Sequence, residues 1–194
     1  MIYDRSSGLK ARRPDQDLAR RVELIAHLGL GEPAREFDAF AQRLAEEAGE
    51  PYAMVNLVTD RQFFVGLHTP KGGDLPAVGR EMSLDDGYCP HVVARGLALP
   101  LPDVCAHPHF AGNQVVDVLH VRTYTGVPLI HGPTGLIIGS LCVLGPQARP
   151  MEEARPRVNL LKVRSADFMK LHAQGAGPWP GTPTRYQSST SLPE

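Results

Sequence analysis

The chain has 194 residues, of which 42% are hydrophobic and 21% charged, and its formal net charge is −1. This length suits one ordinary domain with a sizeable core better than two very small domains. Because 20 Lys and Arg balance 21 Asp and Glu, the chain lacks the electrostatic signature of proteins that bind nucleic acid or anionic membranes. A small neutral or mildly charged ligand, or another protein, is the expected partner.

Neither the N-terminal sequence nor the longest apolar run indicates a membrane protein. The first 15 residues contain no apolar signal-peptide region, and the longest apolar run, "GLIIGSLCVLG" at 135–145, is too short and glycine-interrupted to cross a bilayer. Three cysteines are neither a disulfide framework nor a zinc-ribbon set, which suits a reducing compartment. We therefore expect a cytoplasmic protein without a membrane segment.

The N-terminal quarter is expected to contain two helices after a flexible leader at residues 1–14. Residues 15–30 form a short amphipathic pattern, with Leu18, Val22, Ile25 and Ala26 predicted on one face. A longer helix is predicted from Pro33 to a cap at Gly49. Its apolar residues recur at helical spacing: Phe37, Phe40, Ala41, Leu44, Ala45 and Ala48.

The middle of the chain combines strands with short helices. Residues 52–68 predict two strands joined by the turn "TDRQ", followed by a loop at 69–80 and a short strand at 81–84. A two-turn helix is expected next, capped by Asp85 or Asp86 and ended by Gly96. Residues 97–104 are expected to be extended, because Pro100 and Pro102 exclude a helix and suit an edge strand.

The last third predicts a short helix, a hairpin and a long helix. The short helix covers "HFAGNQVVDVL" at 109–119, and the strands at 121–130 and 135–145 flank the turn "HGPTG". The final helix is expected to start near Pro156 and to bury Val158, Leu161, Phe168 and Met169. Residues 174–194 are rich in Gly, Pro, Ser and Thr, and are predicted to be a disordered tail.

This order of elements indicates an α+β fold. Strands that return as hairpins pair antiparallel, so the terminal helices cover one face of the sheet and the middle segment lies over the other. Short helices and proline-rich loops cover a sheet less completely than long helices do. A pocket under this middle segment is therefore expected.

Two segments resemble the GAF domain family of the bacterial signalling type. They are "GYCPHVVARGLALPLPDVCAHPHFAGNQVV" and "RTYTGVPLIHGPTGLIIGSLCVLG". The matching residues include a cysteine that opens the first lid helix, a "D...P.FA.N" stretch, a "Y.G.PL" strand and an "IG.LCVL" strand: Cys89; Asp103, Pro108, Phe110, Ala111 and Asn113; Tyr124, Gly126, Pro128 and Leu129; Ile138, Gly139, Leu141, Cys142, Val143 and Leu144. The resemblance covers roughly residues 34–170, with Thr125 in place of the usual Ala and Gly145 in place of the usual Asp.

The resemblance implies a single GAF domain over residues 15–173, standing alone in the chain. It implies a six-stranded antiparallel sheet with long helices on one face and a small-molecule pocket on the other. Family members bind cyclic nucleotides, haem, bilins, 2-oxoacids, nitrate and other compounds, so the ligand and any cofactor stay unidentified. Many pair through their first and last helices, so we expect a homodimer of that kind and a signalling protein as partner.

Seven residues are the candidate ligand contacts. Cys89 and His91 begin the first lid helix, where backbone N–H groups attract anions, and Phe110 and Asn113 come from the second lid element. Phe64, Tyr124 and Cys142 come from strands, and ordinary core packing is the alternative role for these three. This module would be non-catalytic; a protein-interaction scaffold whose pocket is filled by its own side chains is the competing hypothesis.

A metal site is a second alternative for the same region. Soft and borderline ligands occur in two clusters: Cys89, His91, Cys105, His107 and His109. The spacing within each cluster is tighter than in zinc knuckles, and prolines stiffen both turns. Solvent-facing histidines and a buried, hydrophobe-like Cys89 are the simpler interpretation.

A thiol enzyme is the third alternative, because the free methionine-R-sulfoxide reductases are a branch of this family. Cys89 lies where that branch has one of its cysteines, but the branch's "GH.AC" signature is missing. Cys105 is misplaced and Cys142 is expected to be a sheet residue, so a suitably paired thiol is not expected. No cysteine is followed directly by His, as a covalent bilin requires, and no histidine is marked as a haem ligand.

Overall fold

The structure, a computed structural model, describes residues 15–70 and 74–172. The predicted leader at 1–14 and tail at 174–194 lie outside these residues. The elements in chain order are α1 (Leu18–His27), α2 (Arg35–Ala48), β1 (Tyr52–Val58), β2 (Gln62–His68), β3 (Glu81–Met82), α3 (Cys89–Arg95), β4 (Leu99–Leu101), η1 (Val104–Ala106), α4 (Pro108–Ala111), α5 (Gln114–Leu119), β5 (Thr123–Ile130), β6 (Ile137–Gly145), η2 (Met151–Glu153) and α6 (Ala154–His172).

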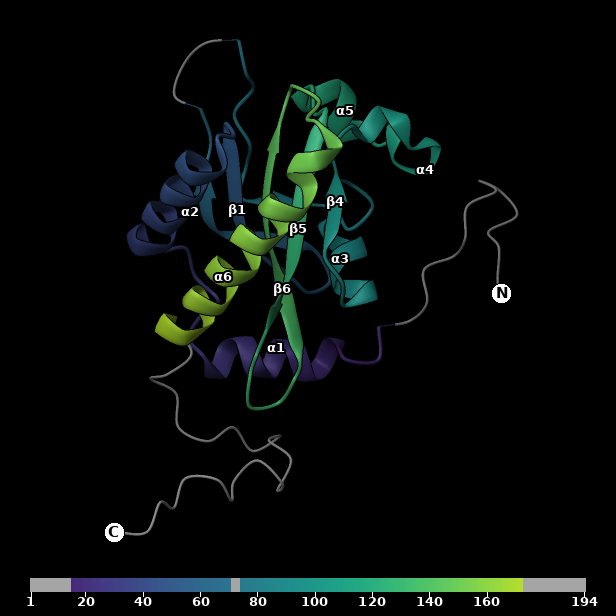
Figure 1. Ribbon diagram of the computed structural model, residues 1–194. Coiled ribbons are helices and arrows are strands. Elements are labelled where there is room, and N and C mark those ends of the chain that lie inside the picture. The colour runs from purple at the N-terminus through teal and green to yellow at the C-terminus, as the bar shows by residue number, and fades with distance from the viewer. Residues whose placement is uncertain (1–14, 71–73, 173–194) are drawn as a thin grey trace, which may run out of the picture.

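One six-stranded sheet organises these elements, in the order β3-β2-β1-β6-β5-β4 with antiparallel pairing throughout. Helices α2 and α6 cover one face, while α3, α4 and α5 lie on the other side, as Figure 1 shows. Both faces of the sheet are therefore buried, which is why the central strands are apolar at almost every position. The predicted α+β fold, with terminal helices on one face, is confirmed.

The predicted face of α1 was right only at Ile25, since Ala26 is exposed and Leu18 is half-buried. Val22 is 47% exposed, whereas Leu24, Ile25 and Arg21 are buried. Arg21 is buried because its guanidinium donates to the carbonyls of Ile137 and Val58, at 2.8 and 3.1 Å, and pairs with Asp15. A charged residue thus anchors α1 to the strand ends, a role that an apolar periodicity does not reveal.

The prediction for α2 is confirmed at each of its six buried positions and at its cap, where Gly49 adopts a φ of 63°. Its aromatic residues meet the last helix across the face of the sheet. The rings of Phe37 and Phe40 lie 5.4 and 5.2 Å from that of Phe168 in edge-to-face contacts. Leu161, Phe168 and Met169 of α6 are buried as predicted, although Val158 is only half-buried and the helix starts earlier, at Ala154.

Two expectations in the middle segment need correction. Neither Asp85 nor Asp86 caps α3, which begins after Tyr88; the prediction that it ends at Gly96 is confirmed by a φ of 65°. The single helix expected over 109–119 is two helices, because Asn113 caps α5 with its side chain and so restarts the helical pattern. The extended segment before them forms β4 at the sheet edge, as expected for a strand containing proline.

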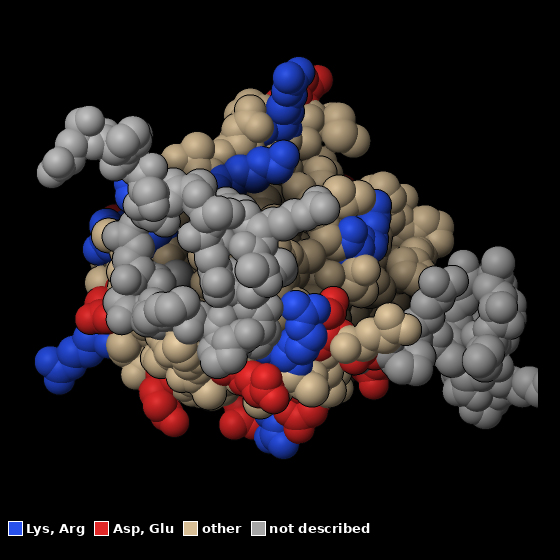
Figure 2. Space-filling model, turned by 90° about the horizontal axis from the view of Figure 1, so that it is seen from below, with Lys and Arg blue, Asp and Glu red and all other residues tan. Residues whose placement is uncertain are grey.

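On the face shown in Figure 2, lysine and arginine side chains occur among acidic ones and form no continuous basic surface. Within residues 15–70 and 74–172, no helix combines the length and the apolar character that crossing a membrane requires.

Candidate functional site

The lid, residues 87–119, packs on a set of strand residues that we call the floor. The floor residues face away from the terminal helices: Met54, Asn56, Gln62, Phe64, Tyr124, Ser140 and Cys142. Alternation along each strand places them there, and the antiparallel register sets Met54 opposite Cys142 and Asn56 opposite Ser140. The floor is thus apolar at its edges and polar at its centre.

Between lid and floor lies a cavity of about 20 Å³, which is room for about one water molecule. Three of the predicted ligand contacts line it, namely Phe64, Cys89 and Tyr124. This void is far smaller than an organic-ligand site, so side chains fill most of the expected pocket in the structure. An organic ligand fits only if the lid moves.

Aromatic side chains close the cavity. Tyr88 and Tyr124 make an edge-to-face contact at 5.1 Å, and Tyr88 also contacts the Phe110 ring at 5.6 Å. The Tyr88 hydroxyl donates to the carbonyl of Phe110 at 3.3 Å, and burial raises the pKa of Tyr88 to about 12, so this donor stays protonated. Sequence reasoning missed Tyr88, although it directly precedes the cysteine that marks the lid.

Two thiols meet beneath the lid. The Sγ atoms of Cys89 and Cys142 are 3.5 Å apart, the Tyr124 hydroxyl donates to Cys89 Sγ at 3.3 Å, and Met54 Sδ lies 3.8 Å from Cys142 Sγ. Both cysteines are buried and free. The expectation that Cys89 lacks a suitably placed thiol was wrong, because Cys142 faces the lid and not the terminal helices.

This arrangement gives the two thiols different pKa values. The hydrogen bond with Cys142 lowers the pKa of Cys89 against the opposing effect of burial, and the side chains of Ser140, Tyr124 and Asn56 lower it further. The same thiol contact, together with burial, raises the pKa of Cys142 well above its ordinary value. Burial and the nearby Cys89 also raise the pKa of Tyr124. Cys89 is therefore the more acidic of the two thiols.

The centre of the floor contains polar groups with unused hydrogen-bonding capacity. The Asn56 amide donates to Gln62 Oε1 at 2.9 Å, and the Gln62 amide donates to the carbonyls of Ser83 and Asp86. Asn56 Oδ1 and Ser140 Oγ are buried, and neither meets hydrogen-bond geometry with a partner among the described residues, although both side chains are close enough to the Cys89 thiol to lower its pKa. Such orphaned atoms are uncommon in folded proteins and mark places for water, ions or ligands. Their sequence signal was a polar residue inside each of two apolar runs, "YAMVNLV" and "IIGSLCVL".

The other predicted contacts lie elsewhere. Asn113 joins the two ends of the lid, since its Oδ1 accepts from the backbone N–H of Gly87 at 2.9 Å. His91 and Phe110 belong to a partly exposed ring cluster with His109, where centroids are 4.9–5.5 Å apart. Cys142 lies in the floor beside the cavity and is not among the residues that line it.

The five candidate metal ligands do not converge. Cys89 is buried under the lid, whereas Cys105 is exposed in η1. In the part of the chain that the structure describes, no group of three or more His, Cys, Asp or Glu side chains is placed to hold a metal ion. Asp103, next to this segment, accepts from the Cys105 N–H and pairs with Arg122 at 2.8 Å, which is a structural role.

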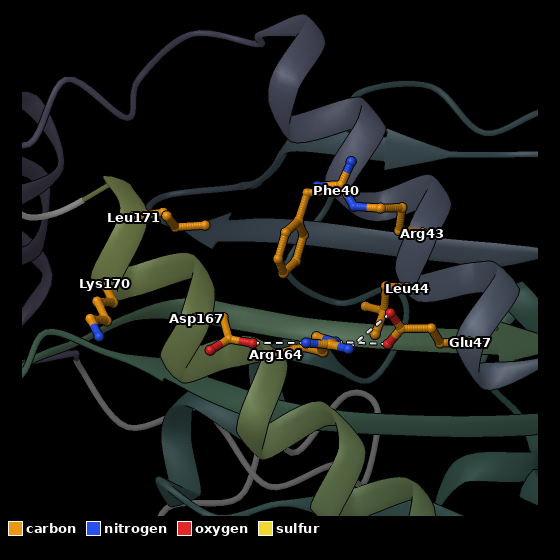
Figure 3. A pocket seen from close by; sticks show the side chains of 8 residues that line it. All are labelled: Phe40, Arg43, Leu44, Glu47, Arg164, Asp167, Lys170 and Leu171. Carbon is orange, nitrogen blue, oxygen red and sulfur yellow. Dashed lines mark hydrogen bonds and ion pairs between the residues drawn. The ribbon is translucent and has the colours of Figure 1, made fainter.

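A second hollow lies on the opposite side of the molecule, between α2 and α6. It has a volume of about 470 Å³. Figure 3 shows Phe40 pointing into it and Arg164 bridging Glu47 and Asp167. Leu171, also at its border, is 68% exposed. Apolar and charged groups are mixed here, as in the rim of a protein interface.

Comparisons with known proteins agree with this architecture. A family profile described as GAF domain matches residues 32–163. No protein with curated function matches the chain.

Several solved structures share the fold. The free methionine-R-sulfoxide reductase from Neisseria meningitidis, solved in complex with its substrate, is 20% identical; the alignment covers 84% of this chain and 96% of that one, with a TM-score of 0.54. The GAF domain of the Thermosynechococcus elongatus photoreceptor PixJ is 16% identical over 84% and 94%, with a TM-score of 0.52. The GAF domain of a Coxiella burnetii phosphoenolpyruvate-protein phosphotransferase is 15% identical over 84% and 100%, with a TM-score of 0.51. At these identities the likeness concerns the fold alone.

Proposed function

Because this chain belongs to the GAF domain family, we propose that it is a non-catalytic sensory module that binds a small molecule between its lid and its floor. Opening of the lid admits the ligand, and a protein partner or a change of dimer state carries the signal onward. A cytoplasmic location is part of this proposal.

The observation that carries the proposal is the pair of orphaned polar atoms in the floor. Asn56 Oδ1 accepts hydrogen bonds and Ser140 Oγ both donates and accepts, so together they suit a small ligand with hydroxyl or amide groups. They lie under a lid of short helices that closes on itself through Asn113 and Gly87, and neither residue lines the small cavity, so a ligand would reach them only with the lid open. The lid helices α3, α4 and α5 can separate from the sheet while β4, which also lies within residues 87–119, stays paired with β5.

The output surface in this proposal is the hollow between α2 and α6. Its exposed Leu171 and its charged rim are suited to pairing with a second copy of the chain or with a signalling partner. The Arg164–Glu47 ion pair at 2.7 Å couples the two helices across it. A shift of α6 relative to α2 therefore alters this surface directly.

A thermal-shift screen of nucleotides, 2-oxoacids and inorganic anions tests ligand binding, because a ligand raises the melting temperature by mass action. We expect at least one compound to stabilise the wild-type protein and to lose most of its effect in Ser140→Ala. Arg164→Ala is the matched control and should keep the effect. A compound whose stabilising effect is lost only in Arg164→Ala binds in the hollow between α2 and α6. That result would contradict a ligand site under the lid.

A thiol reductase is the second candidate, favoured by the 3.5 Å contact between Cys89 and Cys142. The test is a thioredoxin and NADPH-coupled assay with free methionine-R-sulfoxide. Our proposal predicts no turnover above that of Cys89→Ser. Turnover that disappears in Cys89→Ser would replace the sensory function with an enzymatic one.

A further inference from the structure

Cys89 and Cys142 form a buried thiol pair whose geometry has a use of its own. The two residues lie 53 positions apart in the chain, one at the start of lid helix α3 and the other in the central strand β6. Their sulfur atoms are 3.5 Å apart, and a disulfide needs about 2.05 Å. Forming the bond requires the two sulfur atoms to approach by about 1.5 Å.

We propose that Cys89 and Cys142 are a modification site, at which hydrogen peroxide that enters the lid cavity converts the thiol pair into a reversible disulfide. This inference goes beyond the sensory function proposed above. It requires no organic ligand in the site.

The cavity decides which thiol reacts first and with what. Cys89 lines the cavity of about 20 Å³, whereas Cys142 is not among its lining residues. Hydrogen peroxide is only slightly larger than the single water that such a space accommodates. Bulky organic hydroperoxides and glutathione disulfide do not fit the closed cavity and must wait for the lid to open, so the smallest oxidant of this class reacts fastest.

The chemistry proceeds in two steps. The Cys89 thiolate attacks one peroxide oxygen, the O–O bond breaks, and the departing hydroxide takes up a proton to become water; Cys89 is left as a sulfenic acid. The Cys142 sulfur then attacks the Cys89 sulfur, the S–O bond breaks, and hydroxide leaves with the Cys142 proton as a second water. In total, two thiols and one hydrogen peroxide give one disulfide and two waters.

The surroundings suit these roles. Cys89 is the thiol with the lowered pKa, as a nucleophile requires, and Cys142 keeps its proton until the second step. Tyr124 is a positioning residue, because its hydroxyl donates to Cys89 Sγ at 3.3 Å. The bond would fasten α3 to β6 and so hold the lid against the floor.

The test uses the full-length protein carrying Cys105→Ser, which removes the exposed third thiol. Treated with hydrogen peroxide and unfolded under non-reducing conditions, it should lose the mass of two hydrogen atoms and resist alkylation. Peptide mapping should join Cys89 to Cys142, and dithiothreitol should reverse the change. Cumene hydroperoxide should react at least about tenfold more slowly, because it does not fit a cavity of one water.

Variants identify the order of events. Cys142→Ser should stop at a Cys89 sulfenic acid that a dimedone probe traps, and Cys89→Ser should give no sulfenic acid at residue 142. In Tyr124→Phe, the pH profile of the peroxide reaction should move upward, with a rate about tenfold lower near neutral pH, since one hydrogen bond to the thiolate is lost.

Three results would overturn the inference. The first is that both thiols of the folded Cys105→Ser protein stay fully alkylatable after peroxide treatment and unfolding. The second is a sulfenic acid on Cys142 in place of Cys89. The third is cross-linking only between chains. Mapping of the wild-type disulfide needs no variant, so the inference stays testable even where a substitution impairs folding.

Discussion

At the scale of single residues, the site depends on a glycine that leaves space for a tyrosine. Gly126 lies on the same strand face as Tyr124, and a Cβ added at Gly126 would collide with the Tyr124 phenol. The tyrosine hydroxyl reaches Cys89 only because residue 126 has no side chain. This geometric need accounts for the glycine of the "Y.G.PL" strand without any appeal to backbone conformation.

The first prediction concerns this glycine. We expect Gly126→Ala to displace the Tyr124 ring, to raise the pKa of Cys89, and to destabilise the fold by about 1–3 kcal/mol through overpacking. Urea unfolding measures the stability, and the pH dependence of thiol oxidation measures the pKa. Gly112→Ala is the matched control, because its added Cβ meets nothing within 4 Å; a shift below about 0.5 kcal/mol is expected there. Equal effects of the two substitutions would contradict the assigned role of Gly126.

A second glycine explains a departure from the family pattern. Gly145 stands where the family usually has Asp, and a Cβ there would collide with the Glu50 carboxylate. Glu50 is buried and pairs with Arg149 at 3.0 Å and with Arg157 at 2.6 Å, which joins the end of α2 to the start of α6. In this chain, therefore, the Glu50 carboxylate lies where the side chain of the usual Asp at position 145 would begin.

At the scale of elements, Asp38 of α2 links the helix to the β2 edge of the sheet. Its carboxylate accepts from the Leu67 N–H at 2.9 Å and pairs with the Arg80 guanidinium at 2.7 Å. Burial raises the pKa of Asp38, but the Arg80 and Leu67 hydrogen bonds outweigh burial and hold this pKa below its ordinary value of 3.8.

The second prediction follows from the direction of that shift. Because the folded-state pKa is the lower one, the stabilisation from Asp38 is fully present above pH 3.8 and is lost as the pH falls through the folded-state pKa. Asp38→Asn should therefore reduce the free energy of unfolding at pH 7 and flatten its decline in acid. Denaturant unfolding of both proteins between neutral pH and pH 3 makes the comparison. Parallel stability curves over this range would contradict the prediction.

At the scale of the whole molecule, the outer hollow predicts how the chain associates. We expect Leu171→Glu to weaken a homodimer formed through α2 and α6, because Leu171 is 68% exposed beside the hollow and a charge there would be desolvated in the interface. Sedimentation equilibrium should show a dissociation constant raised at least about tenfold. Val118→Glu, at an exposed site in α5, is the control and should leave association unchanged. A wild-type protein that is monomeric at all concentrations would rule out this interface.

Sequence periodicity predicted the sheet, its hairpins, α2 and most buried positions of α6, because each of these is stabilised by repeated apolar burial. It failed where a single polar contact decides the structure, as with buried Arg21 in α1 and the Asn113 cap that divides the second lid helix. The size of the cavity could not be predicted at all. It depends on how Tyr88, Tyr124 and Phe110 pack together, and no pattern along the chain encodes that packing.

The contact between Cys89 and Cys142 could not be predicted from the sequence pattern either. Residue 142 lies in a strand that is buried on both faces, so alternation of polar and apolar residues gives no sign of which face it occupies. Only the strand register, which sets Met54 opposite Cys142, places this thiol under the lid. The polar residues Asn56 and Ser140 could have been found earlier, since each interrupts an apolar run.

Hydrogen exchange of the reduced protein tests the central claim most directly, because local opening and global unfolding have separable free energies. A lid that opens to admit a ligand predicts that backbone amides of α3 and α5 exchange at least about 100-fold faster than those of β1, β5 and β6, with a weaker denaturant dependence than global unfolding. If the lid amides exchange only with global unfolding, at the same free energy as the central strands, the lid is a fixed part of the core. The protein would then be a scaffold with a filled pocket and not a sensor.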